Sequence, residues 1–135
     1  MSINVCHNPK FLVIDDAPSS RRLVRQYLKQ MGYTQVVEAG NGAEALEKLS
    51  TESVSFIISD YQMADISVPE LLKQIKENEK SKDIPFLMLS APKNSSHKGD
   101  AEKELRDAGV RDCVPTPLNL NSLSSKVQEV LGRAN

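Results

Sequence analysis

The sequence is poor in cysteine and contains no long apolar run. Its two cysteines, Cys6 and Cys113, lie far apart and show neither metal-ligand nor CxxC spacing. We therefore expect reduced thiols, as is usual in a reducing compartment. No apolar segment approaches membrane-spanning length, and residues 1–10 lack the apolar stretch of a signal peptide. These absences predict a cytoplasmic protein with no membrane partner.

The sequence also lacks a strong charge of either sign. It has 17 Lys and Arg against 18 Asp and Glu, for a net charge of -1. Nucleic-acid binders normally carry a basic excess, so we expect no nucleic-acid partner. A length of 135 residues suits one globular domain, and no repeat or linker divides it. We expect an N-terminal arm over 1–10, the domain over 11–132 and a tail over 133–135.

Short apolar runs alternate with amphipathic stretches along the chain. Such runs are typical of strands buried on both faces, and strict alternation with helices predicts right-handed crossovers and a parallel sheet. The fold class is therefore α/β, doubly wound, with five strands and helices on both faces. The predicted strands are 11–14, 36–37, 56–58 running on to Asp60, 86–89 and 112–115, and the predicted helices are 18–31, 43–49, 68–75, 101–108 and 120–131.

Polar side chains follow three of the predicted strands at the point where each ends. Asp15 and Asp16 end the first strand, Asp60 the third and Ser90 the fourth. In a parallel sheet these ends meet at one edge, where sites of this class lie. Three carboxylates together repel one another unless a hard cation such as Mg²⁺ offsets their charge. A carboxylate beside such a cation can attack phosphorus and form an acyl phosphate.

Each of these residues has a simpler explanation when it is taken alone. An aspartate at a strand end is more often a helix cap or a solvated loop residue, and Ser90 alone suits a turn. The prediction of a site depends on all four residues meeting at the same edge of one sheet.

Several segments resemble the receiver domains of response regulators, the CheY-like family. The resemblance covers nearly the whole chain after residue 10, and it implies the flavodoxin-like strand order 2-1-3-4-5. The spacings of 44 residues from Asp16 to Asp60 and 30 from Asp60 to Ser90 fit the family. The segments that carry the resemblance are 11–16, 19–25, 39–46, 58–63, 89–91, 108–110 and Pro117.

The resemblance implies a role for each matching residue. Asp60 would accept the phosphoryl group, and Asp16 and Asp60 would bind Mg²⁺ directly with the backbone carbonyl of Gln62. Asp15 would act mainly through a metal-bound water. Ser90, with its neighbour Ala91, would contact the phosphoryl oxygens and act as a switch.

The resemblance also implies partners. The phosphoryl group would come from a histidine kinase or a phosphotransfer protein, and output would pass to an unknown protein by direct contact. The chain would not be an enzyme, although it would assist its own phosphotransfer. A monomer or a weak homodimer is expected.

The sequence departs from the family at the end of the fifth strand. Thr116 stands where the family usually has a lysine, before Pro117, whose peptide bond is expected to be cis as in typical members. Lys93 and Lys98, in the preceding polar stretch, are the candidates to replace that lysine. An acidic site without the lysine should hold a cation more readily, since less positive charge balances it.

Two further departures concern signalling. Cys113 occupies the position of an aromatic residue that swings inward on activation, so coupling to Ser90 would need other contacts. Ala64 and Val68 replace a proline and a glycine that are common after the acceptor, so that loop is expected to take a different path.

Two other functions fit the same topology. A receiver-like binding module that works without phosphorylation is favoured by the missing lysine and aromatic, and disfavoured by the three retained carboxylates. A flavodoxin-like cofactor binder would need a Ser-, Thr- or Gly-rich loop after the first strand to offer N–H groups to phosphate. The chain has Asp15 and Asp16 there, which would repel it.

Overall fold

A computed structural model describes residues 9–60, 65–89, 107–114 and 118–134, without the side chains of the last two. Within these residues one parallel sheet has the strand order β2-β1-β3-β4-β5, as the sequence predicts. The strands are β1 (Phe11–Ile14), β2 (Val36–Ala39), β3 (Phe56–Asp60), β4 (Phe86–Leu89) and β5 (Val110–Val114). The helices are α1 (Pro18–Gln30), α2 (Gly42–Thr51), α3 (Val68–Glu77) and α5 (Leu120–Ala134).

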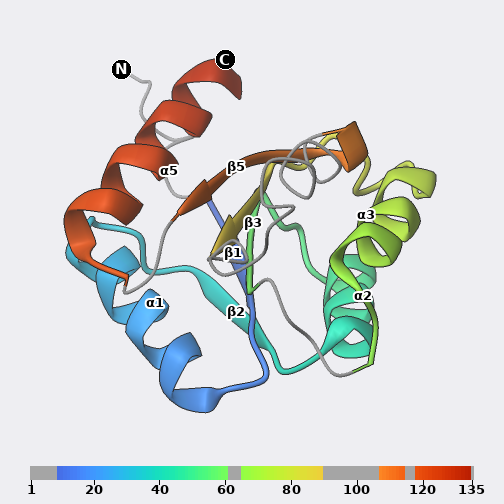
Figure 1. Cartoon of the computed structure of the whole chain (residues 1–135), viewed down its shortest axis with the longest axis horizontal. Coiled ribbons are helices and arrows are strands. Elements are labelled where there is room, and N and C mark those ends of the chain that lie inside the picture. The colour runs from blue at the N-terminus through green and yellow to red at the C-terminus, as the bar shows by residue number, and fades with distance from the viewer. Residues whose placement is uncertain (1–8, 61–64, 90–106, 115–117, 135) are drawn as a thin grey trace, which may run out of the picture.

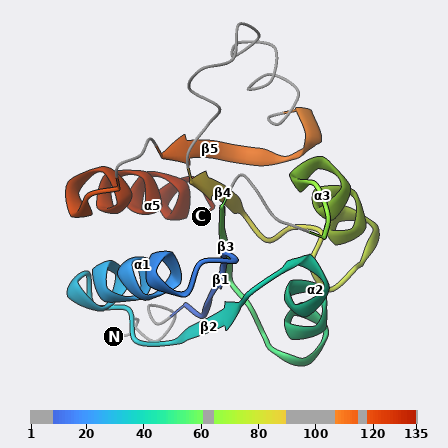
Figure 2. The ribbon, with the colours of Figure 1, turned by 60° about the horizontal axis from the view of Figure 1, so that its bottom comes forward.

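The helices cover both faces of the sheet. Figure 1 shows α1 and α5 on one side of the strands and α2 and α3 on the other, and Figure 2 shows the same two layers after rotation. Side chains of a strand alternate between the faces. In β1, Phe11 and Val13 pack toward α1 and α5, whereas Leu12 and Ile14 pack toward α2 and α3. All four are fully buried, which explains why the strand is apolar throughout.

Local signals fix where the helices begin and end. Pro18 opens α1, where its missing N–H would have no partner within the helix. Gly32 follows α1 with a φ of 99°, a conformation that glycine adopts readily. The side chains of Asn41 and Ser67 cap α2 and α3 by accepting from the backbone N–H of Glu44 and Glu70. The strand ends and helix starts of the polar edge are therefore held in place.

The fifth strand was predicted two residues too late. It begins at Val110, which is buried, and follows Gly109, whose φ is 123°. The charged residues Arg111 and Asp112 hid this start, because they interrupt the apolar pattern that marks the other strands. The carboxylate of Asp112 accepts from the Lys126 ammonium at 2.9 Å. Most of the predicted helix over 101–108 lies outside the described residues. Among the helices that are described, none has both the length and the apolar character needed to cross a membrane.

Candidate metal and phosphoacceptor site

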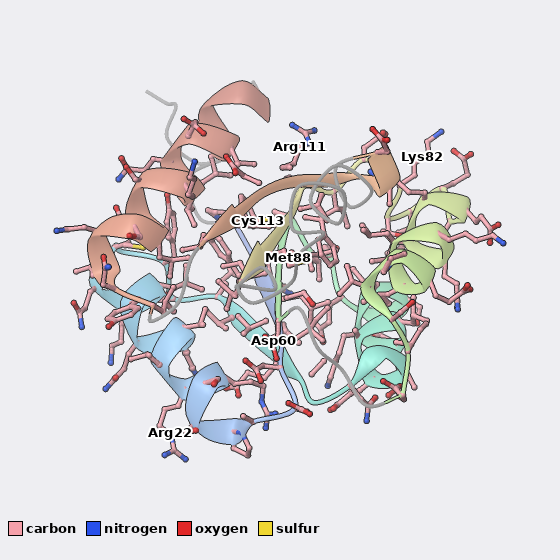
Figure 3. All side chains as sticks on the ribbon, in the orientation of Figure 1. Arg22, Asp60, Lys82, Met88, Arg111 and Cys113 are labelled. Carbon is pink, nitrogen blue, oxygen red and sulfur yellow. The ribbon has the colours of Figure 1, made fainter. Side chains whose placement is uncertain are left out.

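Strand register brings the predicted acidic residues together. Ile14 of β1 pairs with Ser59 of β3, so the next residues along each strand, Asp15 and Asp60, lie side by side at the carboxyl edge. Carboxylate oxygens of Asp15, Asp16 and Asp60 all lie within 4.8 Å of one another. Figure 3 shows Asp60 at the end of β3, on the edge where α1 begins. The sequence-based prediction of one acidic cluster is confirmed for these three side chains.

Asp15 is held at three points. Its backbone N–H donates to the Ala39 carbonyl at 3.0 Å, and its Oδ1 accepts from the Ala17 N–H at 2.9 Å. Its own carbonyl accepts from Nη1 of Arg21 at 2.6 Å. The residue is only 4% exposed, so its carboxylate has a fixed position at the floor of the cluster.

The acidic cluster carries an electrostatic cost. The pKa of Asp15 is raised to about 6, chiefly by burial and to a lesser extent by the neighbouring charges of Asp60 and Asp16. The N–H of Ala17 and the charge of Arg21 act in the opposite direction on this pKa. Asp16 is exposed and Asp60 half-buried, so a cation can approach from solvent.

The donor set fits Mg²⁺. This ion prefers oxygen ligands at about 2.0–2.1 Å and keeps several waters, so two directly bound oxygens lie at most about 4.2 Å apart. Oxygens within 4.8 Å of one another suit two direct ligands and one that acts through water. Three carboxylates also supply the negative charge that offsets the desolvation of such an ion.

Five other predicted site residues lie outside the described residues. They are Gln62, Ser90, Ala91, Thr116 and Pro117. Cys113 is described: it is half-buried in β5 and packs against the cluster that α2 and α3 cover. Figure 3 shows it one strand away from Met88 of β4, with which it is paired in register.

Known proteins resemble this chain in both sequence and fold. The family model described as the response regulator receiver domain matches residues 11–128. This chain belongs to that family. The receiver is 30% identical over 126 residues to the chemotaxis protein CheY of Pseudomonas aeruginosa, covering 93% of this chain and 98% of that one. It is 32% identical over 124 residues to CheY1 of Helicobacter pylori, covering 91% and 97%.

A solved structure agrees with these relatives. The chemotaxis response regulator CheY4 of Vibrio cholerae superposes with a TM-score of 0.81 at 29% identity, covering 91% of this chain and 98% of that one. The chain is therefore a signalling domain of two-component systems, a class that acts by accepting a phosphoryl group and is not generally counted among enzymes. Receiver domains bind Mg²⁺ at an acidic site, and this chain has an acidic cluster of Asp15, Asp16 and Asp60 at the carboxyl edge of its sheet.

Sequence reasoning missed two groups of residues around the receiver's site. Arg21 joins the Asp15 carbonyl to Glu38 of β2, whose carboxylate accepts from Nε of Arg21 at 3.1 Å. Asp65 accepts from the backbone N–H of Gly42 and of Ala43, each at 3.0 Å. Both interactions join segments far apart in the chain, so no local pattern indicates them.

Proposed function

We propose that Asp60 is the phosphoacceptor of this receiver and that Mg²⁺ is its cofactor. The observation that carries the proposal is the cluster of Asp15, Asp16 and Asp60 within 4.8 Å at the carboxyl edge. Asp60 ends a central strand, is half-buried, and lies beside the two acidic residues that follow β1. A carboxylate in this position can be reached by a phosphodonor and is fixed by the strand behind it.

The proposed reaction moves a phosphoryl group from nitrogen to oxygen. A carboxylate oxygen of Asp60 attacks phosphorus and forms a P–O bond, while the P–N bond to the donor's histidine imidazole breaks. The electron pair of that bond stays on the imidazole nitrogen, so atoms and charge balance. Bound Mg²⁺ would offset the negative charge that gathers around the phosphoryl oxygens. Asp16 and Asp60 would hold the ion directly, and Asp15 would act through water.

The proposal also includes the partners of the receiver and its location in the cell. A histidine kinase or a phosphotransfer protein would supply the phosphoryl group, and the receiver would assist the transfer by placing Asp60. Phosphorylation would alter contacts with an unidentified downstream protein, in the cytoplasm. Contact of Gln62, Ser90 and Ala91 with the metal or the phosphoryl group, and effects of Thr116 and Pro117, remain predictions.

The test uses a small phosphodonor, such as acetyl phosphate, with and without Mg²⁺. Intact-mass measurement should show one phosphoryl adduct that requires the metal and is absent in Asp60→Asn. Asp83→Asn is the matched control, because Asp83 is an exposed aspartate before β4, at the opposite end of the sheet. An adduct that persists in Asp60→Asn would contradict the assignment. No adduct in the natural sequence would favour a binding module that works without phosphorylation, which the cysteine at position 113 also favours.

A further inference from the structure

Arg21 contacts the peptide unit that joins two of the three clustered acids. Its Nη1 donates to the carbonyl oxygen of Asp15 at 2.6 Å, and this oxygen belongs to the peptide bond between Asp15 and Asp16. A peptide unit is planar, so a hydrogen bond to its oxygen also fixes the orientation of the Asp16 backbone N–H and Cα. Arg21 therefore orients both acids of the pair through one contact.

The guanidinium is itself held on its other side. Its Nε donates to Oε1 of Glu38 at 3.1 Å, while Oε2 of Glu38 accepts from Nη1 of Arg25 at 2.8 Å. Glu38 belongs to β2 and Arg25 lies one helical turn beyond Arg21. The side chain of Arg21 is only 20% exposed, whereas that of Arg25 is 58% exposed. The network ties α1 and β2 to the end of β1.

This geometry depends on the shape of arginine. One planar guanidinium contacts two acceptors, one just after β1 and one in β2, and its fixed fork makes both contacts at once. A lysine at the same place has the same charge but a single ammonium on a flexible stem. Comparing arginine with lysine at position 21 therefore separates the effect of the positive charge from the effect of the two-way contact.

We propose that Arg21 is a positioning residue for the metal site: through the Asp15–Asp16 peptide it holds the acidic pair in the arrangement that binds Mg²⁺. The proposal rests on the proposed function, because it assigns a role in the same site. It extends that function to a residue of α1 that would act through the Asp15 carbonyl and not as a metal ligand. Partners of metal ligands commonly contribute 10–100-fold to affinity, so the effect should be measurable.

Charge and position predict opposite results for this residue. Arg21 is a cation whose charge acts on Asp15 of the acidic cluster, so on charge alone its removal should strengthen Mg²⁺ binding. If it positions the acidic pair, its replacement should weaken binding. The charge-conserving Arg21→Lys isolates the second effect, because the electrostatic change is small and only the two-way contact is lost.

The experiment measures the Mg²⁺ dissociation constant by isothermal titration calorimetry, at a temperature where circular dichroism shows each variant folded. Arg21→Lys should weaken binding roughly tenfold. Arg22→Lys is the matched control and should bind as the natural sequence does: Arg22 is exposed on the same helix turn and points away from the molecule in Figure 3. Glu38→Gln should weaken binding to a smaller extent, and it serves as the second variant if Arg21→Lys fails to fold.

The outcomes separate the two proposals. If the natural sequence binds no Mg²⁺, the proposed function fails before Arg21 is tested. If it binds Mg²⁺ and Arg21→Lys binds equally well or more tightly, the positioning role is overturned and the proposed function stands. Weaker binding in Arg21→Lys with unchanged binding in Arg22→Lys supports the positioning role.

Discussion

The middle of the central strands consists of buried apolar residues, whereas charged residues stand at their carboxyl ends. In β3, Phe56, Ile57 and Ile58 are fully buried and apolar, whereas Asp60, at the end of the same strand, is half-buried and charged. At the end of β1 the chain likewise changes from apolar Ile14 to charged Asp15, which is itself buried. A single strand therefore passes from a segment that stabilises the fold to a segment whose charges oppose one another.

The difference indicates a division of roles along each strand. Burial of apolar side chains in the middle contributes to the free energy of folding. At the carboxyl edge, burial and then the like charges of Asp60 and Asp16 raise the pKa of Asp15, and this costs stability when no cation is bound. Stability and ion binding should therefore respond to different substitutions, even within one strand.

The largest expected effect comes from the middle of β3. Ile57→Ala should lower the free energy of unfolding by about 3–4 kcal/mol, because it removes buried methyl groups and leaves a cavity between Leu12 and Phe86. Ile57 lies about 10 Å along the strand from Asp60, so the Mg²⁺ dissociation constant should change less than about twofold. Urea denaturation and calorimetric titration measure the two quantities.

Asp60→Asn should have the opposite effect to Ile57→Ala, changing ion affinity and not stability. It should abolish strong Mg²⁺ binding while it leaves the free energy of unfolding unchanged or higher, since one of three like charges is removed. Equal losses of stability and ion affinity in both variants would contradict the division between the strand's middle and its end.

A smaller effect is expected from the charge of Asp15. Its pKa is about 6 in the folded protein against 3.8 for an ordinary aspartate, so the folded state binds a proton more tightly than the unfolded state. Stability without metal should therefore fall as pH rises from about 4 to about 6, and stay low above that range. Asp15→Asn removes this loss and keeps an oxygen for the Ala17 N–H. Without Mg²⁺ it should be more stable at pH 7.5 by about 1–2 kcal/mol, allowing for solvent near the cluster.

The check is thermal unfolding of both proteins between pH 3.5 and pH 7.5, first with a chelator and then with Mg²⁺. The advantage of Asp15→Asn should vanish at the acid end of the series and should be reversed by Mg²⁺, which binds the natural sequence more tightly. If the difference in stability between Asp15→Asn and the natural sequence does not change with pH, the charge of Asp15 is not its cause.

The apolar middle of the sheet could be predicted from the sequence almost residue by residue. The runs 11–14 and 86–89 are the observed strands, and the third run extends to Asp60 as expected. Each run is buried on both faces, so its composition alone indicates a strand. Prediction was weaker at the edges, where β2 extends two residues past 37 and β5 starts at Val110, because charged residues there interrupt the apolar pattern.

The carboxyl edge could be predicted only in part. The strand ends and the family resemblance identified Asp15, Asp16 and Asp60, because topology alone brings these ends together. Arg21, Glu38 and their link to the Asp15 carbonyl could not be found, because their contacts depend on how α1 packs beside β2. A sequence pattern gives the face of a helix, and it does not give the distance between two side chains on different elements.

The smallest expected effect concerns a polar contact behind the edge. Two backbone N–H groups, from Gly42 and Ala43 at the start of α2, hold the pKa of Asp65 below its usual range. Its carboxylate is exposed, so solvent weakens the contact. Asp65→Asn should leave global stability nearly unchanged and raise amide hydrogen exchange at Gly42 and Ala43 severalfold.

Ser67→Ala is the control for this contact, because it removes the cap of α3 and should leave the exchange of the two α2 amides unchanged. Acid should bring the natural sequence toward Asp65→Asn, since a carboxyl whose pKa is lowered by folding stabilises the fold above that pKa and loses the contribution as it is protonated. Ile66, which follows Asp65, packs closely against Gly42: a Cβ on Gly42 would lie 2.1 Å from Cγ2 of Ile66. The side chain of Ile66 therefore stays packed against the start of α2 even without the carboxylate. A large loss of global stability in Asp65→Asn would contradict the local role assigned to Asp65.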